Sequence, residues 1–122
     1  MKLGDAFLMS VPPNFHVDHL FFVISDPQAH GGTFLIANIT GDQFRAGEEC
    51  TLAKGEHPWI KKECFVAFAD ALKITPAQCQ MIEALVGTRV RLQPSLSPET
   101  LAKIVSAAKQ SKAIPVGFKK YL

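Results

Sequence analysis

Histidine is the residue type in this chain best suited to chemistry near neutral pH, and it occurs at positions 16, 19, 30 and 57. A free imidazole has a pKa of about 6.5, so it can take or give a proton under physiological conditions. His16 and His19 follow Pro12-Pro13 and precede an apolar run, which predicts a position at the junction of a loop and a strand. Two exposed loop histidines would give the same pattern. His30 lies in a glycine-containing turn and is expected to be solvated.

His57 stands in a second candidate segment, Gly55-Glu56-His57-Pro58-Trp59-Ile60, which contains the only tryptophan of the chain. Pro58 restricts His57 to an extended conformation, and Trp59 and Ile60 are expected to anchor the loop in the core. A histidine held rigidly beside an anchored aromatic ring is a candidate functional residue. The alternative is a plain turn whose tryptophan plugs one end of a barrel.

Three lysines flank this segment and are candidate phosphate ligands, although lysines beside a loop are often only solvated. They are Lys54, Lys61 and Lys62. The histidines have no carboxylate or cysteine at a spacing typical of metal sites, so neither a metal nor another cofactor is expected. Cys64 is interpreted as a small core residue of a strand rather than as a nucleophile.

Histidines, lysines and a threonine would suffice for one reaction that needs no metal. RNA carries its own nucleophile, the 2′-hydroxyl, so a protein that cleaves it needs a base, an acid and cationic or hydrogen-bonding groups at the phosphate. The requirement is permissive, and many proteins that are not enzymes satisfy it.

The elements that would position these residues are mainly strands. Short apolar runs separated by Gly, Pro, Asp and Asn predict strands over 6–11, 19–25, 33–40, 49–52 and 64–68. A further strand is predicted over 88–93, with Val90 and Leu92 on a buried side and Arg89 and Arg91 on the other. Many short strands with Gly and Pro turns indicate a small barrel or curled sheet.

Two helices follow, each with a clear start signal. Thr75 is predicted to cap a helix over about 76–86, with Gln78 completing a capping box and Gly87 ending the helix. Ser97 is predicted to cap a second helix over about 98–110, whose apolar face holds Leu101, Ile104, Val105 and Ala108. The fold class is therefore mainly β with α, with helices covering one opening or face of the barrel.

Composition sets the class of protein. With 122 residues, 48% of them hydrophobic and 20% charged, the chain is expected to form one domain spanning 1–122. An odd count of three cysteines, with no C-x-x-C pair, predicts neither a disulfide framework nor a zinc ribbon. No apolar run approaches the roughly 20 residues that span a bilayer, and no cleavable signal is evident. A cytoplasmic protein without a membrane partner is expected.

Charge is uneven along the chain. Residues 86–122 hold seven Lys or Arg and one Glu, whereas residues 1–85 hold six Lys or Arg and ten Asp or Glu. Such asymmetry is typical of a phosphate-binding face or a dock for an acidic partner, and equally of a solvated helix face with a basic tail. The basic set is Arg89, Arg91, Lys103, Lys109, Lys112, Lys119 and Lys120.

The strand pattern resembles the MazF/PemK-like toxins over about residues 3–70. Gly4-Asp5 precedes an apolar strand, a loop follows, then the strand from His19, then a strand ending at Thr40. The segment from Ser97 onward is also similar to that family's closing helix. The family consists of small SH3-like barrels from bacterial toxin–antitoxin modules, many of them metal-independent endoribonucleases. The resemblance implies an endoribonuclease that forms a homodimer and binds an acidic antitoxin.

The resemblance also assigns site residues. Thr40 stands where the family has its catalytic threonine, and His19-Leu20 stands where the family has a catalytic arginine. Arginine is a fixed cation, whereas histidine is cationic only when protonated. Either the chemistry has moved to histidines or this divergent member binds without cutting. The expected catalytic residues are His19, Thr40, His57 and His16, and the expected substrate-binding residues are Lys54, Lys61 and Lys62.

Three functions remain open at this point. If the protein is a ribonuclease toxin, four residues should converge in one groove: His16, His19, Thr40 and His57. A non-catalytic barrel that binds protein or nucleic acid through its basic C-terminal half predicts scattered histidines and a continuous basic face. A small subunit of a larger assembly predicts an exposed apolar interface built from Phe7, Phe15, Phe44, Phe118 and Tyr121.

Overall fold

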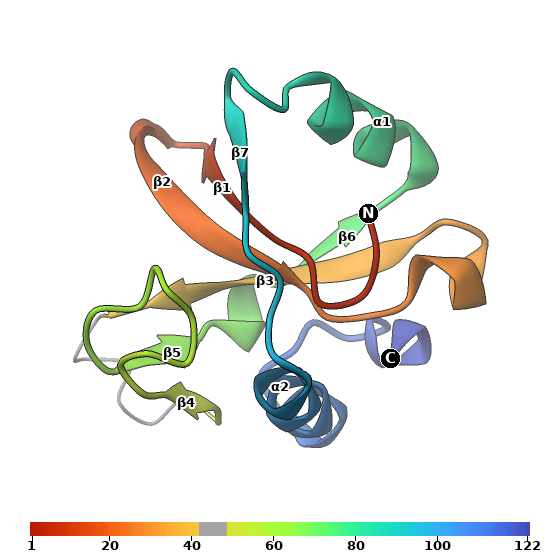
Figure 1. Ribbon diagram of the computed structural model, residues 1–122. Coiled ribbons are helices and arrows are strands. Elements are labelled where there is room, and N and C mark those ends of the chain that lie inside the picture. The colour runs from red at the N-terminus through yellow and green to blue at the C-terminus, as the bar shows by residue number, and fades with distance from the viewer. Residues whose placement is uncertain (42–48) are drawn as a thin grey trace.

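The computed structural model describes residues 1–41 and 49–122 and shows a mainly β protein with two helices (Figure 1). Phe44 lies outside the described residues. Within them, the strands are β1 (Ala6–Val11), β2 (Asn14–Val23), β3 (Phe34–Thr40), β4 (Thr51–Leu52), β5 (Cys64–Val66), β6 (Leu72–Ile74) and β7 (Val90–Gln93). The helices are α1 (Pro76–Ala84) and α2 (Pro98–Gln110), with 3-10 turns η1 (Pro27–His30), η3 (Phe68–Asp70) and η4 (Lys119–Tyr121).

In the described part of the chain, the seven strands form one curled antiparallel sheet. Its order is β4-β5-β3-β2-β1-β7, with β6 paired to β3 off this path. The path begins at β4 and ends at β7, so the sheet is not closed into a barrel. The expected mainly β fold with a small curled sheet and two helices is confirmed.

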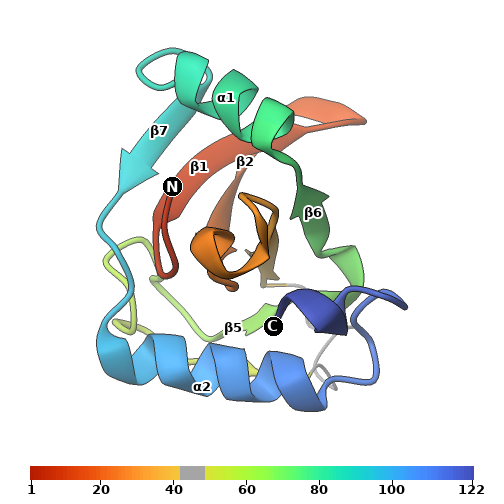
Figure 2. The same ribbon diagram turned by 90° about the vertical axis from the view of Figure 1, so that its right-hand side faces the viewer.

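The sheet buries side chains on both faces. Leu20 and Phe22 of β2 belong to a core that includes Ile104 and Ala108 of α2, whereas Phe21 and its neighbours of the same parity belong to a second core on the other face. Figure 2 shows the strands between α1 above and α2 below. Because successive strand side chains point to opposite faces, two cores explain why the runs in β2 and β3 are continuously apolar rather than alternating.

Both helices begin where the caps predict. The Thr75 hydroxyl accepts a hydrogen bond from the Gln78 backbone N–H at 3.3 Å, and the Gln78 side chain accepts one from the Thr75 N–H at 2.9 Å. The Ser97 hydroxyl accepts from the Thr100 N–H at 3.2 Å. The helix α1 ends at Ala84, short of the predicted 86. Gly87, with φ of 90°, instead forms the turn into β7, a conformation that favours glycine.

Two predicted strands differ from the observed ones in ways that bear on the site. β2 begins at Asn14 rather than at 19, because Pro12 and Pro13 form a two-residue turn closed by the Val11–Asn14 pair. His16 and His19 therefore lie inside a strand and not at a loop junction. The predicted strand 64–68 ends at Val66 and continues as η3, followed by β6, which the sequence did not predict. The run over 64–68 is continuously apolar because it is buried, not because it is extended throughout.

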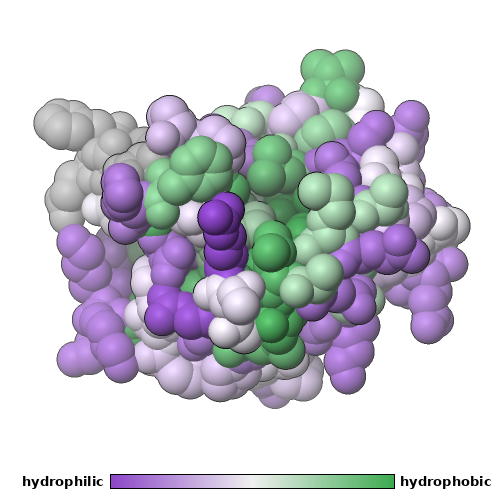
Figure 3. Space-filling view, turned by 90° about the horizontal axis from the view of Figure 1, so that it is seen from above, coloured by the Kyte–Doolittle hydropathy of each residue, from purple (hydrophilic) through white to green (hydrophobic). Residues whose placement is uncertain are grey.

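Exposure corrects two further expectations. Val90 is buried as predicted, but Leu92 is 60% exposed because β7 is the edge strand of the sheet. Phe7 is fully buried and stacks on Phe21 with ring centroids 5.8 Å apart, so it cannot belong to an assembly interface. Phe15, by contrast, is exposed. Figure 3 looks down on the end of the molecule opposite α2 and shows apolar side chains gathered in the middle of that face.

Candidate functional site

The C-terminal end of β3 lies between two hollows. The first, the His19 groove, has a volume of about 630 Å³ and is lined by Val11, Pro12, His19, Phe21, Asn38, Ala69, Asp70, Ala71 and Leu72. The second, the Trp59 pocket, has a volume of about 550 Å³ and is lined by Ile39, Gly41, Trp59, Ile60, Lys61, Lys62 and Cys64. Asn38 lines the first hollow, Ile39 and Gly41 line the second, and Thr40 lines neither.

Strand geometry places His19 in its groove. His19 pairs with Met9 of β1, and the last pair between β2 and β3 joins Phe21 to Asn38. Beyond that pair β3 leaves β2 and pairs with β5. The groove occupies this divergence, with residues 69–72 at its other wall. The half-buried imidazole meets the Phe21 ring edge-on, with centroids 6.4 Å apart.

Thr40 shares a face with His19. Side chains two residues apart on a strand point the same way. Counted from the Phe21–Asn38 pair, His19 and Thr40 are each two residues further along, in the same direction. Both side chains therefore project from one face at one end of the sheet. Thr40 is half-buried and pairs with Phe65 of β5.

The groove holds polar groups of complementary kinds. The His19 imidazole can accept a proton, and the Asn38 amide can donate hydrogen bonds to an anionic oxygen. The Asp70 carboxylate, at the end of η3, lines the opposite wall and is exposed. Sequence analysis did not single out Asn38 or Asp70. No signal in the sequence indicated Asp70, because the predicted strand over 64–68 did not indicate the 3-10 turn η3 that carries it.

The Trp59 pocket supplies an aromatic surface and two cations. The Trp59 side chain is 40% exposed, and Lys61 and Lys62 are both exposed. Lys62 lies along the end of β3, because a Cβ built on Gly41 would be 3.2 Å from the Lys62 Cε. Exposed tryptophan beside lysine is a surface that can stack on a base and neutralise a phosphate. Lys54 is exposed in the preceding turn but does not line the pocket.

Cys64 is a lining residue of this pocket and is a neutral thiol. Burial, which disfavours the thiolate, raises the pKa of Cys64 to about 11, and the nearby Glu56 carboxylate adds to the shift. A thiol of that pKa is protonated at neutral pH and is a poor nucleophile.

His57 does not reach either hollow. It is 1% exposed, with its ring 5.8 Å from that of Phe22. Its Nδ1 accepts a hydrogen bond from the Trp59 backbone N–H at 3.1 Å, so its Nε2 carries the proton that is donated to the Pro94 carbonyl at 2.7 Å. Both ring nitrogens are engaged, and the ring is sealed from solvent. Ile60 is buried as predicted, but Trp59 is 40% exposed, so the prediction that Trp59 anchors the loop in the core was wrong.

His16 is also separate from His19. The two are three residues apart on β2, in a stretch where the pairing with β1 shifts register between Met9–His19 and Val11–Asn14. His16 is exposed and does not line the His19 groove. The expected convergence is thus limited to His19 and Thr40 at one side of β3's end and Lys61 and Lys62 at the other.

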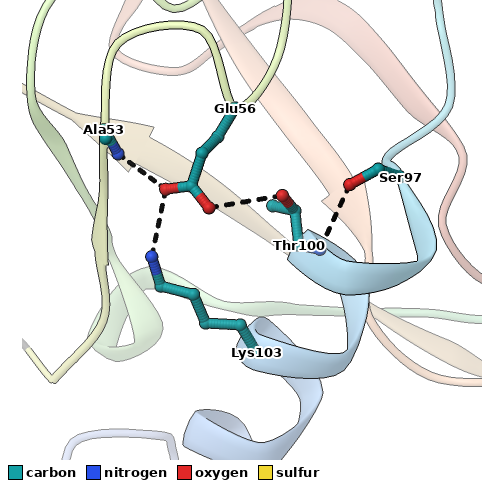
Figure 4. A network of polar contacts seen from close by, with 5 residues as sticks. All are labelled: Ala53, Glu56, Ser97, Thr100 and Lys103. Carbon is teal, nitrogen blue, oxygen red and sulfur yellow. Dashed lines mark hydrogen bonds and ion pairs between the residues drawn. The ribbon is translucent and has the colours of Figure 1, made fainter.

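A carboxylate network holds the turn that carries His57 and Trp59 (Figure 4). The Glu56 carboxylate accepts hydrogen bonds from the Ala53 N–H at 2.7 Å, the Thr100 hydroxyl at 3.3 Å and the Lys103 ammonium at 3.0 Å. Burial opposes ionisation of Glu56, but the Ala53 N–H and the bonded charge of Lys103 outweigh it and lower its pKa. The charged form of Glu56 therefore fastens the turn to α2.

The basic C-terminal half is divided in space. Arg89 and Arg91 lie at β7, at one end of the molecule, and Lys103 and Lys109 lie on α2, at the other (Figures 1 and 2). Lys103 and Arg91 are in ion pairs, with Glu56 and Asp18 respectively. The half is therefore not a continuous basic face.

Neither a protein-family model nor a curated protein matches the chain. None of the helices in residues 1–41 and 49–122 combines the length and the apolar character that a membrane crossing requires. Within the same part of the chain, no three His, Cys, Asp or Glu side chains are grouped so that they could hold a metal ion.

Proposed function

We propose that the protein is an endoribonuclease that cleaves single-stranded RNA without a metal, at the end of β3. The observation that supports this most is the closeness in the chain of two different linings. Asn38 lines a groove with an acid–base group, His19, and Ile39 and Gly41, which follow it, line a pocket with an aromatic ring and two cations. RNA cleavage needs both kinds of site side by side, because the substrate must be held by its phosphates and bases while one proton is removed.

The step uses the RNA's own nucleophile. His19 takes the proton of a 2′-hydroxyl, and the oxygen attacks the adjacent phosphorus. The bond from phosphorus to the 5′-oxygen breaks, and that oxygen takes a proton from solvent. The products are a 2′,3′-cyclic phosphate and a 5′-hydroxyl, so atoms and charges balance. Asn38 and Thr40 donate hydrogen bonds to the phosphate oxygens, and Lys61 and Lys62 bind the flanking backbone.

The resemblance to MazF/PemK-like toxins adds three expectations to the proposal. The protein would act in the cytoplasm, form a homodimer and be neutralised by an acidic antitoxin. Light scattering on the purified protein measures the oligomer directly, and a monomer at high concentration would remove the homodimer from the proposal.

The test is an incubation of the purified protein with a labelled single-stranded RNA and excess EDTA. We expect fragments that end in a 2′,3′-cyclic phosphate, identified by mass spectrometry. The matched control is the same oligonucleotide with one 2′-deoxy substitution at the cleaved position, which we expect to be bound and left intact. Intact RNA after incubation with soluble protein would contradict cleavage, and binding without cutting would favour the non-catalytic alternative.

A further inference from the structure

A third hollow, the Arg89 groove, lies between the β1–β2 hairpin and the start of β7. It has a volume of about 610 Å³ and is lined by Ser10, Phe15, Asp18, Thr88, Arg89 and Arg91. Neither the sequence motifs nor the proposed reaction accounts for this combination of an aromatic ring, two guanidinium groups and two hydroxyls.

The electrostatics of the groove favour an anion. The Arg91 guanidinium is paired with the Asp18 carboxylate, so these two charges offset each other. Among the described residues, Arg89 has no ion-pair partner, and its side chain is exposed. A guanidinium with all its donors open to solvent is well suited to bind phosphate oxygens in a bidentate manner.

Phe15 gives the groove a stacking surface. Its side chain is 61% exposed, although phenylalanine is usually buried. The ring belongs to neither of the two cores. An exposed ring beside a guanidinium matches a nucleotide, whose base stacks on the ring while its phosphate meets the cation. An acidic peptide would use Arg89 but would give the ring no flat partner.

The hairpin links this groove to the His19 groove. Ser10 and Phe15 line the Arg89 groove, and Val11 and Pro12, which lie between them in the chain, line the His19 groove. The tip of the hairpin, where β1 and β2 meet in Figure 1, therefore has one groove on each side. A strand of RNA that lies at His19 and crosses this tip reaches Arg89.

We propose that the Arg89 groove binds a further nucleotide of the same single-stranded RNA, with the base against Phe15 and the phosphate on Arg89. This inference rests on the proposed function. It implies that RNA length determines affinity, because a short substrate fills only the His19 groove and a longer one also fills the Arg89 groove.

The experiment compares the affinities of two 2′-O-methyl oligonucleotides, which cannot be cleaved, for the wild type and three variants. One is a dinucleotide and the other has about 12 nucleotides, within the range of single-strand sites. Arg89→Gln is expected to raise the Kd of the longer oligonucleotide about fivefold to tenfold. It should also reduce the magnitude of the slope of log K against log salt concentration by about one, the contribution of one phosphate contact. Phe15→Ala is expected to raise the same Kd about tenfold. Lys109→Gln on α2 also removes one exposed charge and is the matched control. It is expected to change neither the Kd of the longer oligonucleotide nor its salt dependence.

The outcomes separate this inference from the proposed function. If the longer oligonucleotide binds Arg89→Gln and Phe15→Ala as tightly as it binds the wild type, the Arg89 groove proposal is overturned while cleavage can still stand. If both variants weaken binding but the wild type cuts no RNA, the groove stands and the ribonuclease fails. If Lys109→Gln weakens binding equally, the effect is general charge attraction and the groove is overturned. If poly-glutamate binds the wild type as tightly as the longer oligonucleotide does, and Arg89→Gln weakens both to the same extent, the assignment to a nucleotide is overturned.

Discussion

His19 and His57 show how two histidines that look alike in sequence differ in what they can do. His19 lies half-buried on a strand and lines a groove together with Asn38 and Asp70. His57 is sealed in the core, with one ring nitrogen donating to Pro94 and the other accepting from Trp59. A ring whose two nitrogens are already used in the fold has no capacity left for a substrate. This difference is why we propose a role in the reaction for His19 and a structural role for His57.

The largest expected effect is the loss of RNA cleavage when His19 is replaced. His19→Gln removes the proton acceptor and should lower the rate of RNA cleavage by about 10²- to 10⁴-fold, with the free energy of unfolding changed by no more than about 0.5 kcal/mol. The rate is measured under single-turnover conditions. His16→Gln, the same substitution at an exposed position that does not line the His19 groove, is the control and should leave the rate within about twofold. Equal loss in both variants would contradict the assignment of His19.

The converse substitution should act on stability. His57→Ala leaves a cavity beside Phe22 and removes the partners of the Pro94 carbonyl and the Trp59 N–H. We expect the free energy of unfolding to fall by about 3 kcal/mol, measured by urea denaturation. A variant that keeps wild-type stability and loses cleavage would show that His57 acts in the reaction after all.

Trp59 tests whether the structural turn also serves binding. Because its side chain is 40% exposed, Trp59→Ala should cost little stability. Loss of the stacking surface should weaken RNA binding by about 1–3 kcal/mol, measured by fluorescence anisotropy. Trp59→Phe, which keeps a ring, should retain most of the affinity. Unchanged affinity in both variants would limit the Trp59 pocket to a packing role.

The sequence predicted the features that neighbouring residues determine, and it did not predict those that depend on contacts made only in the fold. Helix N-caps and apolar runs are local, so both helices and the first three strands could be located from the chain alone. The burial of His57 depends on Pro94, which is 37 residues away and meets it only in the fold. Likewise, His19 and Asp70 line one groove although they are 51 residues apart in the chain. No pattern in neighbouring residues encodes either arrangement.

The smallest expected effect is on the stability of the protein at low pH. Glu56 binds Lys103 of α2, and Glu49 binds the residues that follow the helix, through the Ser111 hydroxyl and the Lys112 N–H. The Ser111 hydrogen bond is the main cause of the lowered pKa of Glu49. Because both folded pKa values are below the ordinary 4.5, the stabilisation is present above about pH 4.5 and is lost as the pH falls through the folded values.

Denaturation curves at a series of pH values measure this loss. Glu56→Gln should make the protein less stable at pH 7 and should flatten its response between about pH 5 and pH 3. Glu99→Gln, which removes an exposed carboxylate from the first turn of α2, is the control and should keep the acid response of the wild type. An identical response in Glu56→Gln would show that the network in Figure 4 does not fasten the turn.

The contrast between the two histidines is tested most directly by the rates at which diethylpyrocarbonate modifies each imidazole in the native protein, followed by mass spectrometry. We predict that His19 reacts and that His57 does not react until the protein unfolds. A bound 2′-O-methyl dinucleotide should slow modification of His19 and leave His30, which lies in η1 against Tyr121, unchanged. Native modification of His57, or a dinucleotide that protects His30 as much as His19, would contradict the account.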